Sequence, residues 1–164
     1  METINDLVAQ LPTPPTDFEG RLDAYAPLMG GIINSFIPTG SHPDMDRYLY
    51  SPLRAYSENA GKRHRPLICF EACRAVGGDM QKATSAAAAI EHFHTAALIH
   101  DDIADEGEMR RGMPCMHLTE GVGLAINVGD LALSTVNGSV VDDPLLDDAT
   151  KVRVISELIN MTRR

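Results

Sequence analysis

The sequence predicts an all-α domain, and three observations support this prediction. Apolar residues make up 44% of the 164-residue chain, enough to bury a core, whereas aromatic residues make up only 5% and tryptophan is absent. A core built mainly from Ala, Leu, Ile, Val and Met favours helices over sheets. Several segments repeat apolar residues at helical spacing, and short polar or Gly/Pro-rich stretches separate them.

The first two helices follow an irregular start. Three prolines break up residues 1–15, which we expect to form an arm, so the helical domain is expected at residues 16–164. A Thr-Asp pair at residues 16–17 can cap a first helix, because apolar residues then recur at helical spacing up to Phe36. The loop IPTGSHP follows, and a second helix is expected over residues 44–57.

The third and fourth helices flank a pair of glycines. The third is expected to begin at Pro66, whose missing N–H would be unpaired in a first turn anyway, and to end at Gly77-Gly78. The fourth is expected from about Met80 through SAAAAIEHFHTAALIHDDIAD, which neither Pro nor Gly interrupts. The stretch EGEMRRGMP is expected to end this helix as a loop.

Two more helices are expected towards the C-terminus. The segment GVGLAINVGDLALSTVNGSVV predicts a fifth helix, weakened by Gly129, and ATKVRVISELINMTRR predicts a sixth that runs to the end of the sequence. Between them, DDPLLDD is expected to form a turn and a helix cap. Short connections between helices are typical of a helical bundle.

Charge and cysteine content exclude several classes of protein. The 23 acidic residues outnumber the 14 basic ones, which argues against nucleic-acid binding and suits a protein that holds divalent cations. The three cysteines include no CxxC pair, which argues against a disulfide framework and a zinc site. No signal peptide is evident and no stretch approaches the ~20 apolar residues that span a bilayer, so we expect a cytoplasmic protein.

Acidic side chains gather at the end of the fourth helix. At about 100° per residue, Asp101 and Asp105 lie one turn and about 40° apart, whereas Asp102 lies about 100° away, at the border of that face. His94 and Ala97 share the face. Two ionised carboxylates at this spacing, near the negative end of the helix dipole, repel each other unless a cation lies between them. Oxygen ligands of this kind suit Mg²⁺, which completes its shell with water and phosphate oxygens.

Two groups of cations accompany these carboxylates. The motif GKRHRP places Lys62, Arg63 and Arg65 beside the start of a helix, and Arg110-Arg111 follows the acidic cluster. Helix N-termini and clustered cations bind anions. With an apolar stripe below the carboxylates, these residues predict a site for a diphosphate that carries a hydrocarbon tail. Solvated acidic and basic segments are the alternative interpretation of the same residues.

The order and spacing of these motifs resemble the trans-isoprenyl diphosphate synthases, also called the polyprenyl synthetase family. The resemblance rests on GKRHRP, HTAALIHDDIADEGEMRRGMP and GVGLAINVGD, and it covers residues 61–130 closely. It implies an isoprenoid-synthase-type helical bundle around a deep cavity, here only its N-terminal half. It also implies a prenyltransferase that condenses an allylic diphosphate with isopentenyl diphosphate, head to tail, and that usually dimerises.

The resemblance implies roles for individual residues. Asp101, Asp102 and Asp105 match the first aspartate-rich motif, whose Mg²⁺ ions hold the allylic diphosphate. Arg110 matches an arginine that holds the same group, and this chemistry needs no side-chain nucleophile. The positions that match the binding of isopentenyl diphosphate are Lys62, Arg65, His94 and Arg111.

Product length in this family depends on side-chain bulk just before the first aspartate. Ala96 and Ala97 occupy these positions, and their small size implies a product of geranylgeranyl size or longer. On the helical wheel Ala97 lies on the aspartate face and Ala96 lies well off it. Phe93, one turn below, is itself a candidate for the floor of the cavity.

The family's chains are much longer, and their second aspartate-rich motif has no counterpart here. The aspartates of DDPLLDD do not replace it, because the segment contains a proline and reads as a helix cap. We therefore expect the N-terminal part of a synthase domain, with exposed apolar surface and little or no synthase activity of its own.

Two other functions are compatible with the residues. A metal phosphohydrolase of the HD type would use His94, His100 and Asp101 around a catalytic water, although the two histidines lie about 120° apart on the helix. A non-catalytic or regulatory subunit that pairs with a longer synthase chain would suit the short length but has no need of an intact DDxxD motif. For His92 and His100 the alternative is a helix histidine with an ordinary partner.

Overall fold

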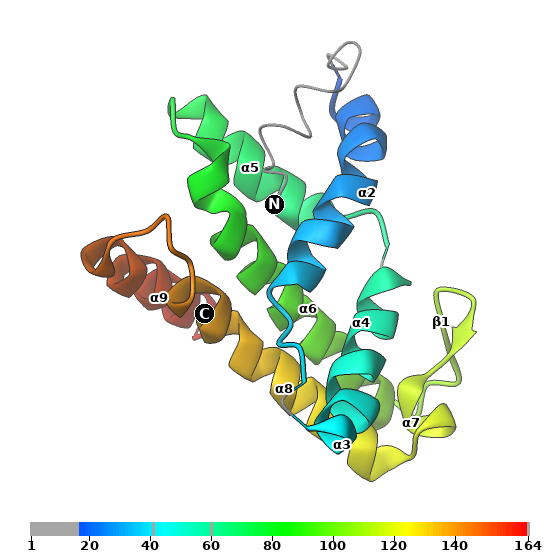
Figure 1. The fold of residues 1–164 in the computed structure, drawn as a ribbon. Coiled ribbons are helices and arrows are strands. Elements are labelled where there is room, and N and C mark those ends of the chain that lie inside the picture. Colours follow the sequence, from blue (N-terminus) through cyan, green and yellow to red (C-terminus); the bar gives the residue numbers. More distant parts are fainter. Residues whose placement is uncertain (1–16, 41, 60, 164) are drawn as a thin grey trace.

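The structure, a computed structural model, describes residues 17–40, 42–59 and 61–163. This part of the chain is helical apart from one short hairpin, which confirms the all-α prediction (Figure 1). The first helix, α2, spans Phe18–Ser35, and its N-cap Asp17 accepts a hydrogen bond of 2.7 Å from the Gly20 N–H, as predicted. The arm predicted for residues 1–15 lies outside the described residues.

The second predicted helix is a run of three consecutive helical segments. These are α3 (Pro43–Met45), the π-helical η1 (Asp46–Tyr50) and α4 (Ser51–Glu58). The prediction of a helix over residues 44–57 is therefore confirmed, with a local change of hydrogen-bond period in its first half.

The third helix, α5, spans His64–Ala75 and begins two residues earlier than predicted. Pro66 still lies in the first turn, where its missing N–H removes no intrahelical bond. The C-terminal end is as predicted: Gly77 adopts a φ of 74°, and its N–H donates to the Arg74 carbonyl at 2.9 Å.

The fourth helix begins with a 3₁₀ turn, η2 (Met80–Ala83), and continues as α6 (Thr84–Ala104). The segment EGEMRRGMP follows the end of this helix, as predicted, but it is not a plain loop. It contains an antiparallel hairpin of β1 (Met109–Arg110) and β2 (Met113–Pro114). Both residues of the connecting turn have positive φ, 54° at Arg111 and 80° at Gly112, which is the backbone that joins strands tightly.

The remaining helices are a four-residue α7 (Met116–Thr119), α8 (Val122–Val141) and α9 (Asp148–Thr162). The side chain of Asp147 caps α9 by accepting a hydrogen bond of 2.7 Å from the Thr150 N–H. This confirms the prediction that DDPLLDD forms a turn and a cap.

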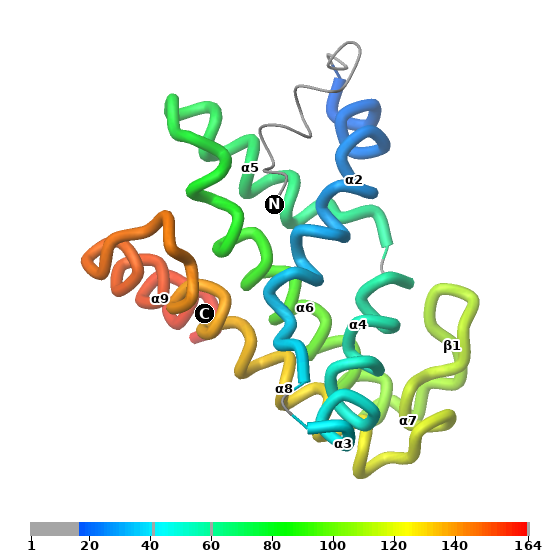
Figure 2. The backbone as a smooth tube through the Cα atoms, in the orientation of Figure 1, coloured from blue at the N-terminus to red at the C-terminus, as the bar shows by residue number. Residues whose placement is uncertain are grey.

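Helix α6 lies at the centre of the bundle, between α2 and α5 on one side and α8 on the other (Figures 1 and 2). Its packing against α8 is the most extensive in the fold. Small side chains let α6 pack closely on both sides: Ala89 and Ala96 are buried against residues of α8, whereas Ala87 and Ala88 are buried against α2 and α5.

Helix α8 was not expected to meet the criteria for a membrane span, but by length and composition it does. It has 20 residues with a mean hydropathy of 1.3. However, 44% of this stretch is buried inside the protein, and core helices pass the same test. Its packing against α6 accounts for its apolar character.

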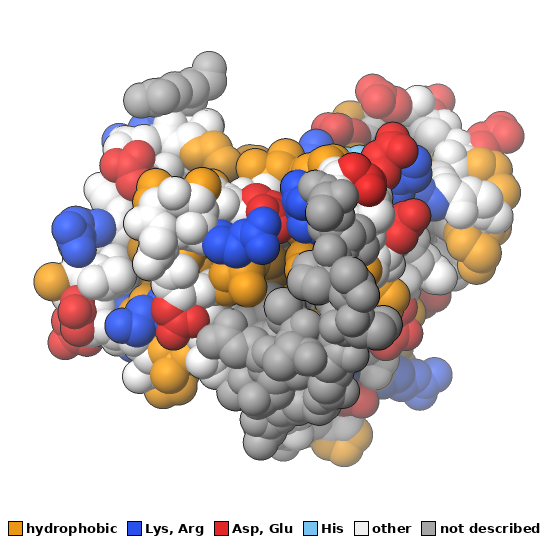
Figure 3. Space-filling model, turned by 90° about the horizontal axis from the view of Figure 1, so that it is seen from above, with side chains coloured by type: hydrophobic (Ala, Val, Ile, Leu, Met, Phe, Trp, Pro, Cys, Tyr) orange, Lys and Arg blue, Asp and Glu red, His pale blue; other side chains and the backbone are white. Residues whose placement is uncertain are grey.

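Apolar side chains remain exposed along α8 and α9. The exposed fraction is 50% for Val122, 53% for Val141 and 67% for Val152. Seen from above, the surface mixes acidic and basic side chains with hydrophobic ones (Figure 3). The expectation of exposed apolar surface on this chain is therefore confirmed.

Candidate functional site

Two stacked carboxylates lie at the C-terminal end of α6. The helix ends at Ala104, and the N–H of its C-cap residue Asp105 donates to the carbonyl of Asp101 at 2.8 Å. Both residues are exposed. Within the part of the chain that the structure describes, no group of three or more His, Cys, Asp or Glu side chains is arranged to hold a metal ion. Two free carboxylates nevertheless fit Mg²⁺, which takes one or two protein carboxylates and fills its shell with water and phosphate oxygens.

Asp102 lies in different surroundings from its two neighbours in the motif. Its side chain is 4% exposed, and its Oδ1 accepts a hydrogen bond of 2.6 Å from the Nε of Arg110. Partial burial opposes the charge of this guanidinium, but the hydrogen bond and the negative charge of Asp102 outweigh it and raise the pKa of Arg110. The carboxylate thus holds the hairpin arginine rather than facing solvent with Asp101.

Further backbone hydrogen bonds attach the hairpin to the end of α6 and close the hairpin itself. The Gly107 N–H donates to the Asp102 carbonyl at 2.9 Å, and the Cys115 N–H donates to the Glu108 carbonyl at 3.0 Å. Burial and the nearby Asp102 carboxylate raise the pKa of the Cys115 thiol, so this cysteine stays protonated. Burial and Asp102 also raise the pKa of Tyr56, on α4, to about 12.

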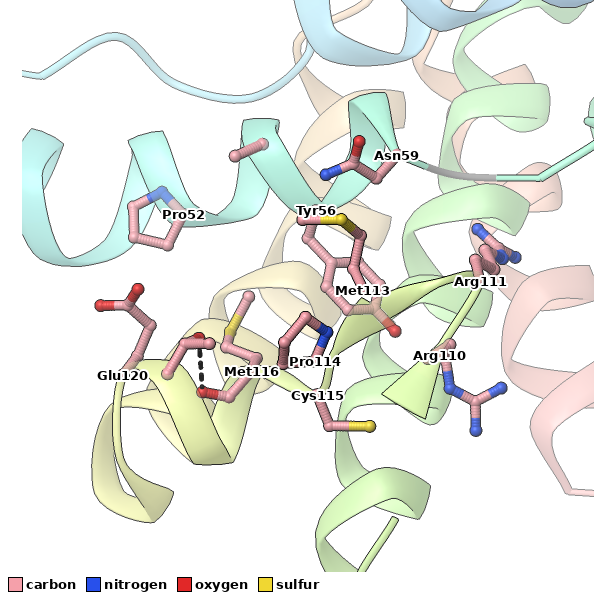
Figure 4. Close-up of a pocket in the computed structure, with 12 residues that line it drawn as sticks. Pro52, Tyr56, Asn59, Arg110, Arg111, Met113, Pro114, Cys115, Met116 and Glu120 are labelled. Carbon is pink, nitrogen blue, oxygen red and sulfur yellow. Dashed lines mark hydrogen bonds between the residues drawn. The ribbon is translucent and has the colours of Figure 1, made fainter. Parts of the chain in front are cut away.

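A cavity of about 180 Å³ separates α4 from the hairpin and α7 (Figure 4). Pro52, Met116 and Glu120 lie at one end of it, and the guanidinium groups of Arg110 and Arg111 lie at the other. The polar side of the hairpin is therefore turned towards the end of α6.

The two cationic patches of the sequence meet in space. A Cβ on residue 61 would lie only 3.4 Å from Cζ of Arg111, so glycine at this position lets the Arg111 guanidinium approach the segment before α5. Lys62 and Arg65, in that segment and at the start of α5, are exposed. The predicted cations thus gather around the place where α5, the hairpin and α6 come together.

His94 connects this group of cations to α6. Burial, followed by the charge of Arg65, lowers the pKa of its imidazole, and Arg111 and Arg110 act in the same direction. Arg65, Arg110 and Arg111 thus all disfavour protonation of the same imidazole. A neutral imidazole near cationic side chains suits a bound anion.

An apolar path descends α6 from the carboxylates. Ala97 is half-buried, whereas Ala96 is fully buried in the core beside Ile37 and Leu53. Further down, Phe93 lines a cavity of about 280 Å³ between α8 and α9. A larger cavity of about 660 Å³, between α6 and α9, is lined by Ala86, Ile90, Val154, Leu158 and Met161 among others.

The arrangement of His100 does not suit the HD-type metal site. Its Nε2 lies 3.5 Å from the carbonyl of Ile126 and 3.6 Å from Oδ1 of Asp130, both on α8. This ring therefore packs across to α8, whereas His94 lies among the arginines. The segment DDPLLDD also has a structural role, because Asp143 is buried and its side chain accepts a hydrogen bond of 2.8 Å from the Leu145 N–H.

Two residues have a role that the sequence did not indicate. Arg63 was predicted with Lys62 and Arg65 as part of the cationic group, and Glu91 was not singled out. The structure pairs them in the interior, with Nη1 of Arg63 2.8 Å from Oε1 of Glu91. Glutamate on an otherwise apolar part of α6 was the available signal, because a buried carboxylate needs a partner.

A family comparison matches most of the chain. The model of the polyprenyl synthetase family matches residues 46–163. Geranylgeranyl pyrophosphate synthase 11 of Arabidopsis thaliana, named as chloroplastic, is 43% identical over 146 residues, which cover 87% of this chain and 40% of the plant protein.

Solved structures agree with the sequence comparison. The fold is similar to that of geranylgeranyl pyrophosphate synthetase from Pyrococcus horikoshii, with a TM-score of 0.77 and 36% identity over 87% of this chain and 42% of that chain. It is also similar to an FPP/GFPP synthase from Zymomonas mobilis, with a TM-score of 0.76 and 26% identity over 84% of this chain and 50% of that one. The chain thus spans half or less of the length of these relatives.

Proposed function

The chain belongs to the polyprenyl synthetase family, that is, the trans-isoprenyl diphosphate synthases, and from this we propose that it is the N-terminal part of a prenyltransferase domain over residues 16–164. The proposed reaction condenses an allylic diphosphate with isopentenyl diphosphate and gives a trans-prenyl diphosphate of geranylgeranyl size or longer. Support comes from the relatives, which are named as geranylgeranyl pyrophosphate synthases.

One observation of this chain supports the proposal most strongly: exposed Asp101 and Asp105 lie one helical turn apart at the end of α6, where the hairpin brings in Arg110. Charges of opposite sign at one end of α6, with an apolar path below, fit a ligand that has a magnesium-bound diphosphate head and a hydrocarbon tail. We assign the first substrate's diphosphate to this end of α6.

Magnesium held by Asp101 and Asp105 would neutralise the allylic diphosphate and make it a better leaving group. The protein's own contribution is the Arg110 guanidinium, which Asp102 orients towards that group and which stabilises negative charge as it develops. In this assignment Asp102 belongs to the aspartate-rich motif but acts through Arg110.

We assign the second diphosphate, that of isopentenyl diphosphate, to the cations around His94. Lys62, Arg65 and Arg111 would bind its phosphate oxygens, and the neutral His94 would donate a hydrogen bond. The double bond of this substrate attacks the allylic carbon as the first diphosphate leaves. The proton lost afterwards passes to the departed diphosphate, so no side-chain nucleophile is required.

Product length is assigned to the apolar path. Ala97 leaves room for a growing chain beside α6, and Phe93 sets the first obstruction below it. Ala96 lies in the core between helices, so it affects the path through packing.

Partners and location are proposed by family likeness. We propose a homodimer or a pair with a longer synthase chain, and we propose that the 164-residue chain alone has little synthase activity because it spans 40% of its plant relative. A cytoplasmic location stays a prediction from the sequence, since the plant relatives are named as chloroplastic.

The test is product formation by the protein at its natural length. Labelled isopentenyl diphosphate, an allylic diphosphate and Mg²⁺ should give an extractable prenyl diphosphate, and chelation of the metal should stop its formation. Release of inorganic phosphate from a phosphate ester without any carbon–carbon bond formation would instead support the phosphohydrolase alternative.

A further inference from the structure

Arg63 is the only cation of the GKRHRP motif that turns into the interior. Lys62 and Arg65 are exposed, whereas Arg63 is 5% exposed. An arginine between exposed cations would be expected to add its charge to the same anion site. Its direction shows that it has a different role.

Arg63 links three helices, two through its side chain and one through its backbone. Its Nη1 lies 2.8 Å from Oε1 of Glu91 in the middle of α6, and both side chains are 4% exposed. Its Nη2 donates to the backbone carbonyl of Ser57 near the end of α4. Its own carbonyl accepts a hydrogen bond of 3.2 Å from the Leu67 N–H in the first turn of α5.

The backbone of Arg63 adopts a conformation that only surrounding contacts can maintain. Its φ of 55° and ψ of 33° lie in the left-handed region, which a residue with a long side chain rarely occupies. Arg63 is the N-cap of α5, so its backbone conformation fixes how the chain passes from Lys62 into the first turn of α5, where Arg65 lies. The buried ion pair holds the turn in place.

Glu91 lies one helical turn before His94 on α6. Residues three apart on a helix share a face, so the ion pair lies beneath the imidazole around which Arg65, Arg110 and Arg111 gather. Because Glu91 neutralises it, Arg63 adds little net attraction for an anion. Its effect must come from placing other cations.

A buried ion pair is a poor device for stability alone, since apolar residues of similar volume often stabilise a fold as well or better. Its advantage is geometric, because charge-assisted hydrogen bonds fix both distance and direction. We propose that Arg63 is a positioning residue: its ion pair with Glu91 holds the left-handed turn that aims Lys62 and Arg65 at the diphosphate site around His94. This inference rests on the proposed function.

The test removes the ion pair without leaving a buried charge. The double substitution Arg63→Met with Glu91→Leu, made in the protein at its natural length, replaces both charges by apolar side chains and avoids the misfolding that either single change risks. The control is Arg74→Met, which breaks an exposed pair with Glu71 (2.8 Å) at the other end of α5.

We expect the double variant to keep the melting temperature of the wild type within a few degrees and to bind isopentenyl diphosphate about 10-fold or more weakly, because its cations are no longer aligned. The KM for the allylic diphosphate should stay unchanged. Arg63→Lys should recover part of the affinity, and Arg74→Met should behave like the wild type.

The experiment distinguishes failure of the positioning role from failure of the proposed function. A folded double variant that binds isopentenyl diphosphate as tightly as the wild type would overturn the positioning role and leave the proposed function intact. A wild-type protein that binds no isopentenyl diphosphate would overturn the proposed function itself.

Discussion

Adjacent carboxylates on α6 have opposite environments, although the sequence presents them as one motif. Asp101 is exposed, whereas Asp102 is buried and bonded to Arg110 at 2.6 Å. On the helical wheel the two side chains lie about 100° apart. Their environments differ further because the hairpin places an arginine against Asp102 rather than against Asp101. Metal binding and arginine positioning are therefore assigned to different members of the motif.

Asp102→Asn should lower activity while leaving the response to Mg²⁺ unchanged. The amide keeps the shape but removes the charge that orients Arg110, and we expect a loss of about 1–3 kcal/mol in stability, moderated because Arg110 is 33% exposed. A magnesium titration of the rate checks this. Asp101→Asn is the comparison: it should raise the Mg²⁺ concentration needed for half-maximal rate. An equal rise in the Asp102→Asn protein would make Asp102 a metal ligand.

His92 predicts a pH dependence of stability. It is fully buried, and this burial lowers its pKa to about 4, although a backbone hydrogen bond with Ile33 acts in the opposite direction. Below pH 6.5 the unfolded chain takes up a proton that the folded protein does not, so stability falls between pH 6.5 and 4, by roughly 3 kcal/mol in all.

Denaturant unfolding at several pH values, compared with a His92→Leu variant, measures this effect. The difference in unfolding free energy between variant and wild type should grow in favour of the variant as the pH falls through this range. His64→Gln, a change at an exposed histidine, serves as the control. A difference that stays constant from pH 7 to pH 4 would mean that His92 does not titrate in this way.

At the scale of elements, the periodicity of apolar residues predicted all of the long helices. The ends of the helices and the hairpin depend instead on capping hydrogen bonds and on backbone conformation. Leu22, Met29 and Ile33 are buried along α2 because their spacing follows the helical repeat. The Asp17 and Asp147 caps were predictable from local chemistry alone. The hairpin was not, because a positive φ at Arg111 is held by surrounding structure rather than by the residue type.

The contact between α6 and α8 depends on Gly129. A Cβ there would lie 2.3 Å from Nε2 of His100, so the glycine accommodates the ring. Gly129→Ala gains roughly 1 kcal/mol of helix propensity but displaces His100, and we expect this clash to cancel or exceed the gain. Urea unfolding of a double-mutant cycle with His100→Ala should give a coupling of about 1 kcal/mol.

Gly138→Ala is the matched control for that cycle. It lies in the same helix, and nothing lies within 4 Å of the added Cβ. It should stabilise the protein by about 0.5–1 kcal/mol. If Gly129→Ala stabilises equally in the presence of His100, the ring is free to move and the glycine is not required for the contact.

At the scale of the whole molecule, the site is assembled from segments distant in the sequence. The sequence placed Asp101, His94 and Arg110 in one site by resemblance. In the structure the hairpin contacts both the end of α6, through Arg110 and Asp102, and the segment before α5, through Arg111. The inward direction of Arg63 could not be read from the motif, because it depends on Glu91 in a different helix. The local signal for such a pairing is limited to a glutamate on an otherwise apolar part of α6, which does not say which cation it pairs with.

The length of the prenyl product tests whether the growing chain follows the apolar path beside α6. Ala97→Phe should shorten the main product, because the ring would enter the path just below Asp101 and Asp105, where Ala97 is half-buried. Ala97→Ser, which stays small, should leave the product unchanged. Chromatography of the dephosphorylated products measures the outcome, and an unchanged product distribution for Ala97→Phe would place the growing chain elsewhere.

Calorimetric titration of the natural-length protein with an allylic diphosphate, with and without Mg²⁺, bears most directly on the proposal that α6 presents a diphosphate site. We expect binding that requires the metal and that the double substitution Asp101→Asn with Asp105→Asn weakens by about 100-fold or more, because both carboxylate ligands are lost. Binding of equal strength without Mg²⁺, or unchanged in the double variant, would contradict it.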